Sequence, residues 1–284
     1  MTSHPVAASA DDATARTELL TPEPAEALAG LLDLPSPAFD HTLPPLWHWV
    51  YLLDRPRQDD LGVDGHPTNG IPAPPRPDQR RMYAGGRLTM RQPLRLGEPA
   101  TRSTEVISTA EKLGKSGPLT FVTVRHSFDQ HGTTAIIDER DIVYRPQGPA
   151  LPARDDSNDA APDVTRAPAA ESLALEVDPV LLFRFSALTY NAHRIHYDLD
   201  YARTEGYPDL VIHGPLQVLL MAELLRRLDV SMIGRTFAYR LVAPAFGSQR
   251  ITATLDRGHD TITTEVTDAT GRATATGTLL LPTV

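Results

Sequence analysis

Short runs of alternating apolar and polar positions predict β-strands in both halves of the chain. Four runs rich in β-branched residues lie between residues 80 and 145, and four similar runs lie between residues 236 and 281. Such runs, bounded by Gly, Pro or Asp, are typical of half-buried strands. Both series open with a Pro then Gly pair, Pro93/Gly97 and Pro244/Gly247, which indicates a weak internal duplication. The expected strands are residues 80–90, 103–114, 119–128, 134–145, 236–246, 249–258, 261–268 and 272–281.

Residues 214–228 follow a different pattern, with apolar side chains at helical spacing and few polar interruptions before Arg226 and Arg227. A helix that is apolar around most of its circumference is buried on most sides. A long buried helix followed by four strands predicts an antiparallel sheet wrapped around a central helix, which is an α+β fold. The apolar positions are Leu216, Val218, Leu219, Leu220, Met221, Leu224, Leu225 and Leu228.

Two segments carry too few large apolar residues to pack. Residues 1–18 are small and polar, and residues 146–170 are rich in Pro, Ala and Asp. Such segments cannot bury enough surface to offset the entropy lost on ordering. We therefore expect a disordered N-terminus at 1–18, an N-terminal domain at 19–145, a linker at 146–171 and a C-terminal domain at 172–284.

Composition excludes several classes of protein. The net charge is −9 and no basic tract is present, which argues against nucleic-acid binding. The chain has no cysteine, so disulfides, thiolate catalysis and cysteine-bound zinc are excluded. No run approaches the roughly 18 apolar residues of a membrane helix, and the N-terminus lacks the pattern of a secretory signal. We expect no membrane association and a cytoplasmic location.

Titratable residues gather between residues 190 and 216, which contain three histidines, two arginines, three aspartates and a glutamate. The preceding run, residues 181–189, alternates in polarity and predicts a strand that leads into this cluster. A short helix should follow, because Asp198 stands at an N-cap position and Gly206 lies just past the end. The connection between them carries His193 and His196, where a rigid scaffold can present side chains to a cleft.

The run FSALTYNAHRIHYDLDYA, residues 185–202, resembles the signature of the MaoC-like or type 2 enoyl-CoA hydratases. Several positions fall in register with that signature, namely Phe185, Leu188, Thr189, Ile195, His196 and Ala202. The His-Gly pair at 213–214 also resembles the start of the family's central helix. The resemblance implies a double hot-dog fold, in which two long helices are each wrapped by a curved antiparallel sheet. It also implies a non-catalytic N-terminal half and a catalytic C-terminal half.

Four positions depart from the family signature. Tyr190, Asn191, His193 and Arg194 stand where the family has Gly, Asp, Asn and Pro. This variant is similar to a subgroup that contains mitochondrial-type 3-hydroxyacyl-thioester dehydratases and bacterial itaconyl-CoA or mesaconyl-CoA hydratases. The resemblance implies a hydro-lyase that reversibly hydrates an enoyl-CoA thioester. CoA would then be part of the substrate, and we expect no separate cofactor and no metal.

The motif suggests a role for each residue, and each role has a structural alternative. His196 is the candidate acid/base, because imidazole titrates near working pH, although a buried structural histidine is the alternative. The amide of Asn191 cannot act as a base, so it positions water or substrate or is only a turn residue. His193 is the candidate second titratable group or a surface histidine. Asp198 could orient one of these histidines, but an N-cap role is favoured. Tyr190 is a candidate substrate-binding residue.

The start of the 214–228 helix is a candidate oxyanion site. Helix N-termini present unpaired backbone N–H groups and partial positive charge, and Gly214 would let a thioester oxygen approach closely. An ordinary helix start is the alternative, and His213 is expected to be structural.

Arginine suits carboxylate recognition, and three arginines lie in the segments that carry the resemblance. Arg81, Arg87 and Arg194 could therefore bind a substrate carboxylate or a CoA phosphate, unless they are simply solvated. On this basis we expect a short dicarboxylic acyl-CoA substrate, mesaconyl-CoA or itaconyl-CoA, hydrated to citramalyl-CoA.

Other functions stay open at this point. A 3-hydroxyacyl-thioester dehydratase of fatty-acid or polyketide type is one, and a non-catalytic acyl-thioester binding module is another, because the family aspartate is missing. A metal-dependent hydrolase would use His193 and His196 with His213 or Asp198. A thioesterase is disfavoured by the signature.

The N-terminal half carries no comparable cluster of titratable residues in its sequence. The run at residues 43–53 contains both tryptophans, Trp47 and Trp49, and is either the counterpart helix or a wall of the acyl pocket. Core packing is the favoured interpretation of the two tryptophans. A homodimer is possible.

Overall fold

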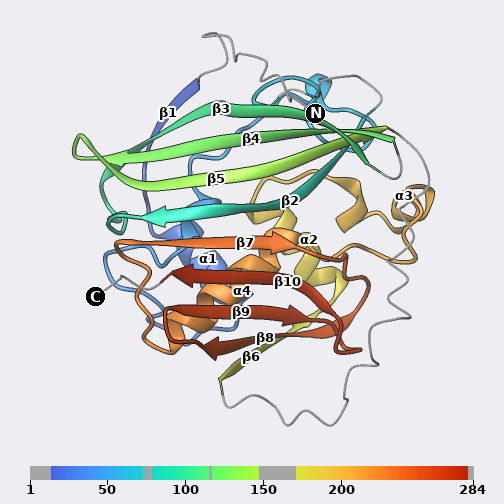
Figure 1. Cartoon of the computed structure of the whole chain (residues 1–284). Helices are drawn as coiled ribbons and strands as arrows, with labels where there is room; N and C mark the ends of the chain where they lie inside the picture. The colour runs from blue at the N-terminus through green and yellow to red at the C-terminus, as the bar shows by residue number, and fades with distance from the viewer. Residues whose placement is uncertain (1–13, 73, 75–78, 115–116, 147–170, 281–284) are drawn as a thin grey trace.

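The structure is a computed structural model that describes residues 14–72, 74, 79–114, 117–146 and 171–280. Ten strands form one continuous antiparallel sheet in the order β1-β3-β4-β5-β2-β7-β10-β9-β8-β6 (Figure 1). The N-terminal half supplies β1 (Thr14–Leu19), β2 (Gln79–Met90), β3 (Pro99–Gly114), β4 (Gly117–Gln130) and β5 (Thr133–Pro146). The C-terminal half supplies β6 (Ser172–Val177), β7 (Arg235–Leu241), β8 (Gln249–Arg257), β9 (Thr261–Thr267) and β10 (Ala273–Leu280).

The two halves repeat one strand order. Counted from its outer edge, the N-terminal half runs β1-β3-β4-β5-β2, and the C-terminal half runs β6-β8-β9-β10-β7. The repeats meet where β2 pairs antiparallel with β7. All eight strands expected from alternation are confirmed, and so is the duplication suggested by the paired Pro and Gly positions.

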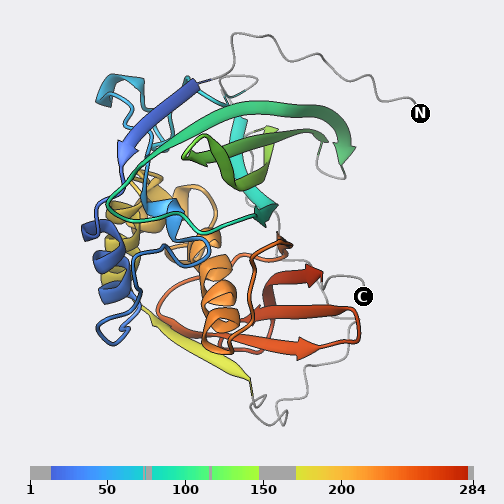
Figure 2. The same cartoon turned by 90° about the vertical axis from the view of Figure 1, so that its left-hand side faces the viewer.

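The helices are α1 (Glu23–Leu31), α2 (Pro179–Leu188), α3 (Leu199–Thr204) and α4 (Gly214–Arg227), with short 3-10 helices η1 (Trp47–Val50), η2 (Gln58–Asp60) and η3 (Arg194–His196). Figure 2 shows α4 beside the strands of its own half, on the side where α1 and α2 also lie. As predicted, α4 is almost wholly buried, from Leu216 to Leu225. None of the described helices is both long and apolar enough to cross a membrane.

Burial of α4 requires partners for its two polar core residues. Thr274 on β10 donates a hydrogen bond of 2.6 Å to the side-chain oxygen of Gln217. Glu223 accepts hydrogen bonds from Arg226 and Arg227 at 2.6–3.0 Å. Paired in this way, both residues avoid the cost of an unsatisfied buried polar group.

Three expectations about the fold are wrong. The first concerns the second long helix. The run at 43–53 forms only η1, because the backbone is left-handed at Leu46 and Leu52, with φ of 68° and 54°, and this conformation ends a helix on both sides. The core-packing interpretation of Trp47 and Trp49 is confirmed, since both side chains are buried.

The second correction concerns residues 181–189, which were expected to form a strand. They lie in α2, which begins with Pro179 after the N-cap residue Asp178, whose carboxylate accepts a hydrogen bond of 2.7 Å from the Leu181 amide. Leu182 and Phe185 are buried three residues apart, which is helical spacing. The apolar residues of this run fit a strand pattern as well as a helical one. The residue that favours the helix is the N-cap Asp178, which lies before the run.

The third correction concerns the N-terminus. Residues 14–18 were expected to be disordered, but they belong to β1, which pairs with β3 from Thr14 to Leu19. Backbone pairing at the sheet edge compensates for their polar composition. Residues 1–13 and most of the expected linker, 147–170, lie outside the described residues.

The seam between β2 and β7 leaves no room for a side chain at Gly86, which yields a stability prediction. A Cβ at Gly86 would lie 2.2 Å from the Glu139 carbonyl oxygen and 2.6 Å from the Tyr239 hydroxyl. We expect Gly86→Ala to lower the free energy of unfolding by about 1–3 kcal/mol in urea unfolding experiments, because overpacking strains the seam.

Gly30→Ala in α1 is the matched control, because a Cβ there meets nothing within 4 Å. This variant should gain roughly 0.5–1 kcal/mol from helix propensity. Equal stability of the two variants would contradict the account of the seam.

Candidate active site

Four imidazole rings form a continuous row between the two halves. His193 lies between His66 and His196, with ring centroids 4.0 Å and 5.4 Å away, and His196 stacks on His213 at 3.7 Å. His193 and His196 come from the connection between α2 and α3, and His213 precedes α4. His66 comes from the N-terminal half, so the row is assembled from both halves of the chain.

His196 is held as a neutral base. Its Nδ1 donates a hydrogen bond of 2.7 Å to the carbonyl oxygen of Val211, since a carbonyl can only accept. The other ring nitrogen, Nε2, is then the unprotonated one and is able to accept a proton. Burial lowers the pKa of His196 to about 4, although the hydrogen bond to Val211 acts in the opposite direction.

His213 is fully buried behind His196. Its Nε2 is hydrogen-bonded to the Ser186 hydroxyl on α2 at 2.9 Å, and its ring packs edge-on against Phe185. Burial lowers the pKa of His213 well below its usual value. A neutral ring in this place supports His196 without adding charge.

The other residues of the signature near the histidine row mainly stabilise the local backbone. The Asn191 side-chain oxygen accepts a hydrogen bond of 3.0 Å from the His193 amide, which makes a side-chain turn. Asp198 caps α3 through the Tyr201 amide at 3.0 Å, and it makes no hydrogen bond to a histidine of the described residues. Instead, Arg194 donates two hydrogen bonds to Asp198 at 3.0 and 2.7 Å. Tyr190 is exposed.

Gly214 opens α4, as expected. A Cβ at this position would lie 2.1 Å from a methyl carbon of Leu241, so a larger residue would force the Leu241 side chain on β7 to move. The first turn of any helix still has N–H groups without an intrahelical acceptor, and Pro215 in that turn has no N–H to lose. The backbone N–H of Gly214 is therefore one of the groups available to an oxyanion.

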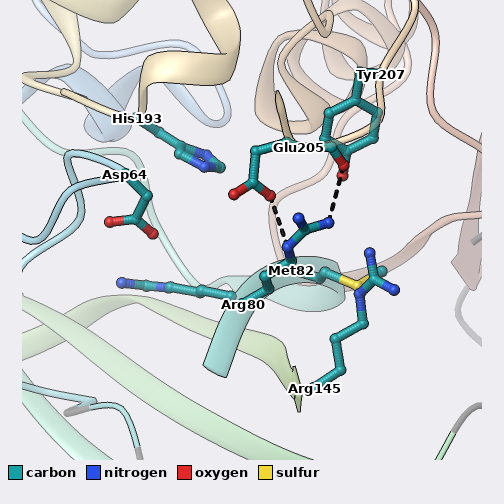
Figure 3. A pocket seen from close by; sticks show the side chains of 8 residues that line it. Asp64, Arg80, Met82, Arg145, His193, Glu205 and Tyr207 are labelled. Atoms are coloured by element: carbon teal, nitrogen blue, oxygen red, sulfur yellow. Dashed lines mark hydrogen bonds and ion pairs between the residues drawn. The ribbon is translucent and has the colours of Figure 1, made fainter. Parts of the chain in front are cut away.

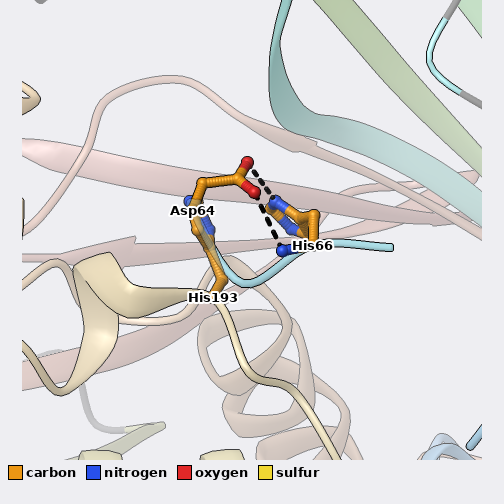
Figure 4. A group of neighbouring side chains, drawn as sticks. All are labelled: Asp64, His66 and His193. Carbon is orange, nitrogen blue, oxygen red and sulfur yellow. Dashed lines mark hydrogen bonds and ion pairs between the residues drawn. The ribbon is translucent and has the colours of Figure 1, made fainter. Parts of the chain in front are cut away.

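A tight turn at residues 62–66 brings a second set of titratable groups to the row. The Asp64 carboxylate is hydrogen-bonded to the His66 ring at 3.1 Å and accepts a hydrogen bond from the His66 amide at 2.9 Å (Figure 4). Between them, Gly65 has φ of 85°, and a Cβ there would lie 1.8 Å from the Ala192 carbonyl oxygen. Only glycine permits this approach.

The turn is also tied to the C-terminal half by hydrogen bonds. The Arg194 amide donates to the Asp64 carbonyl oxygen at 2.9 Å, and the Arg194 guanidinium donates to the Val63 carbonyl oxygen at 3.0 Å. Arg194, which was expected to bind substrate, is thus occupied by Asp198 and by the turn. Sequence reasoning missed Asp64 and His66, although the Asp-Gly-His-Pro run is a turn signal that brings two titratable residues together.

Three arginines and His193 line the same pocket (Figure 3). The pocket is lined by Asp64, Arg80, Arg81, Met82, Arg145, His193, Glu205 and Tyr207. Arg80 is neutralised by Glu205, with a nitrogen to oxygen distance of 2.9 Å. Arg81 makes no ion pair within the part of the chain that the structure describes, and after burial, its positive charge further lowers the pKa of both His66 and His193. The pocket therefore offers an unneutralised cation.

Arg87, the other arginine expected to bind substrate, is directed elsewhere. Its guanidinium pairs with Glu139 at 2.8 Å and with Asp141 at 3.4 Å on the neighbouring strand β5. No contact joins Arg87 to the histidine row among the residues described.

The N-terminal half contains a second group of charges around the fully buried Asp138, which was also missed. Asp138 on β5 accepts hydrogen bonds from the Trp49 indole at 2.7 Å and from Arg140 at 2.9 and 2.7 Å. Although burial raises it, the positive charge of Arg140 holds the pKa of Asp138 well below its usual range. Arg140 is a neighbour on β5, but Trp49 comes from η1, far earlier in the chain, so the sequence does not show the group.

The polar atoms of Asp64, His66 and His193 lie within 4.8 Å of one another, so this set was considered for a metal ion. The positive charge of Arg81 near both histidines would repel a metal cation. The hydrogen bond between Asp64 and His66 also occupies one oxygen of Asp64 and one ring nitrogen of His66. The set assumed for a metal hydrolase is not assembled either, because Asp198 and His196 Nδ1 have other partners. The site is better suited to acid–base chemistry.

A duplicated hot-dog fold with buried neutral histidines beside a helix N-terminus fits an enzyme of the hydratase and dehydratase class. The family of type 2 hydroxyacyl-thioester dehydratases matches residues 46–247, so the chain belongs to this family. It is 47% identical over 226 residues, 78% of each chain, to the mesaconyl-C(4)-CoA hydratase of Chloroflexus aurantiacus.

Solved structures confirm the fold. A MaoC-like dehydratase from Phytophthora capsici matches with a TM-score of 0.68 over 96% of both chains, at 12% identity. A Mycobacterium tuberculosis protein described as having a double hotdog fold matches with a TM-score of 0.55 over 94% of this chain and 95% of its own, at 15% identity. The double hot dog expected from the sequence is confirmed.

The buried histidines predict acid sensitivity. The folded-state pKa of His196 is about 4, whereas an unfolded histidine titrates near 6.5, so between these values the unfolded chain binds more protons. Stability should therefore fall as the pH drops from about 6.5 to 4, and His48, His126, His193 and His213 act in the same direction. Urea unfolding at pH 7.5, 6 and 5 would measure this. Constant or rising stability toward pH 5 would contradict the neutral histidine row.

Proposed function

We propose that this enzyme hydrates a short dicarboxylic enoyl-CoA to citramalyl-CoA, and that mesaconyl-C(4)-CoA is the first candidate substrate. The observation that carries the proposal is the 47% identity to the Chloroflexus hydratase over most of both chains. Itaconyl-CoA is the second dicarboxylic candidate. We further propose that the enzyme acts in the cytoplasm, as its bacterial relative suggests, and the homodimer stays a prediction.

The chemistry of this substrate requires a cation next to the base. In mesaconyl-C(4)-CoA the carbon β to the thioester carries both a methyl group and the free carboxylate. The hydroxyl must add to that same carbon, so the substrate carboxylate lies one bond from the carbon that the water attacks. Arg81 meets this requirement, because it is close to His66 and His193 and has no carboxylate partner among the described residues. A guanidinium binds a carboxylate through two parallel hydrogen bonds.

Water and thioester have separate binding groups. The Nε2 of His196 accepts a hydrogen bond from the attacking water, because Nδ1 is committed to the Val211 carbonyl. As the C–O bond forms, electron density moves to the thioester oxygen. The N-terminus of α4, through the Gly214 amide and the helix dipole, stabilises this oxyanion. Asn191 contributes by fixing the backbone that carries His193.

The substrate assignment is tested with purified enzyme and four thioesters: mesaconyl-C(4)-, mesaconyl-C(1)-, itaconyl- and crotonyl-CoA. We expect the highest kcat/KM with mesaconyl-C(4)-CoA. Arg81→Gln should raise KM for the dicarboxylic substrate and leave crotonyl-CoA, which has no free carboxylate, nearly unchanged. Arg87→Gln is the matched control, since Arg87 is paired with Glu139. Equal or better turnover of crotonyl-CoA by the wild type would contradict the dicarboxylic substrate.

His196→Ala should lower kcat by about 100- to 10,000-fold with little change in KM, because water activation acts in the transition state. Steady-state kinetics on the best substrate would measure both constants, and thermal unfolding would show that the variant is folded. Near wild-type kcat in a folded variant would support a non-catalytic, thioester-binding role for the motif instead.

Dehydration of a 3-hydroxyacyl thioester is the second candidate, because the family that matches residues 46–247 is described by that reaction. The same groups would act in reverse. Turnover of 3-hydroxybutyryl-CoA faster than citramalyl-CoA would favour it.

A further inference from the structure

The Asp64–His66 pair is not part of the motif that identifies the site, and yet it reaches the same histidine row. The site has a neutral histidine, His196, whose ring is hydrogen-bonded to no carboxylate, and an amide, Asn191, at the position where the family signature has an aspartate. Among the described residues of the C-terminal half, no carboxylate is hydrogen-bonded to a ring of the row, and Glu205, which lines the pocket, is paired with Arg80. The turn at residues 62–66 supplies such a carboxylate.

We propose that the N-terminal half completes the active site, with His66 as the group that carries the transferred proton and Asp64 as its positioning residue. This inference rests on the proposed hydratase function and names a further acid/base group for it. The reaction site is then shared between the two halves.

The geometry of the pair favours this role. The 3.1 Å hydrogen bond joins Asp64 Oδ2 to His66 Nδ1, so Nδ1 carries the hydrogen and Nε2 is free to accept a proton. Hydrogen bonds from His66 hold the pKa of Asp64 below its usual range, in spite of burial, so the carboxylate is ionised. Within the histidine row, His66 is the ring with a hydrogen-bonded carboxylate, and it can therefore hold a positive charge at the lowest cost.

The pair is also accessible, unlike the far end of the row. The side chains of His66 and Asp64 are 20% and 26% exposed, whereas His213 is fully buried. Asp64 lines the arginine-rich pocket together with His193 (Figure 3). A substrate whose carboxylate is bound by Arg81 would place its β carbon beside this pair.

The proton transfer balances without any further reactant. The water oxygen, held by His196 Nε2, bonds to the β carbon while one of its O–H bonds breaks, and that proton moves to His66 Nε2. The electron pair of the double bond moves to the thioester as an enolate. The α carbon then takes the proton from His66, the thioester carbonyl is restored, and His66 returns to its neutral form.

Asp64→Asn is the sharpest variant, because the amide keeps an oxygen for the His66 backbone N–H and so preserves the turn. We expect kcat to fall by about 100-fold or more, with little change in KM. Asp59→Asn is the matched control: it removes the same charge from the same segment, and its side chain is 88% exposed. Thermal unfolding should show both variants folded.

The pH profile separates a positioning role from a structural one. His66 is faced by Asp64, Arg81, Glu205 and His193. Without the negative charge of Asp64, the positive charge of Arg81 has the larger effect on His66. Protonated His66 becomes less stable, so the pKa of His66 falls. Hydration needs neutral His66, and the acid limb of kcat/KM should therefore shift to lower pH in Asp64→Asn. A purely structural effect would lower the rate and leave the limb in place.

A second carboxylate provides a rescue test. Asn191→Asp, introduced into Asp64→Asn, returns a carboxylate to the row from the C-terminal side, and it should restore part of kcat. If Asp64→Asn keeps wild-type kcat and an unshifted acid limb while the wild type hydrates its substrate, the inference is wrong and the proposed function stands. If the wild type hydrates no enoyl-CoA, the proposed function itself fails.

Discussion

The contact between the turn at 62–66 and the segment at 191–194 is the constraint on which the site depends. Gly65 lies against the Ala192 carbonyl so closely that no side chain fits, and Arg194 donates to two carbonyl oxygens of the turn. These contacts fix His66 beside His193. They explain why the residue at the family proline position is an arginine here: it links the two halves, in addition to pairing with Asp198.

Burial is the second determinant of the chemistry. It lowers the pKa of the imidazoles and so keeps the row unprotonated at neutral pH, which leaves ring nitrogens able to accept a proton. The seam of β2 and β7 makes this possible, because it joins the two sheets into one and places the arginines of β2 beside histidines of the other half. A duplicated fold whose described residues form one long helix, α4, can thus build one site from unequal halves.

The sequence predicted the strands, α4 and the short helix capped by Asp198, because alternation, helical spacing and capping are local signals. It misassigned α2, whose apolar residues fit a strand as well as a helix until the cap at Asp178 is considered. It also grouped His193 with His196 correctly, since they are neighbours in the chain. Asp64 and His66 lie more than a hundred residues earlier, and only the sheet seam and the Gly65 contact bring them to the row. No local pattern contains that information.

A crystal structure with methylsuccinyl-C(4)-CoA, the saturated analogue of the proposed substrate, would test the shared site most directly. The account predicts the free carboxylate on Arg81, the β carbon between His66 and His196, and the thioester oxygen at the Gly214 amide. An acyl group bound on the C-terminal half alone, out of reach of His66 and Arg81, would contradict it.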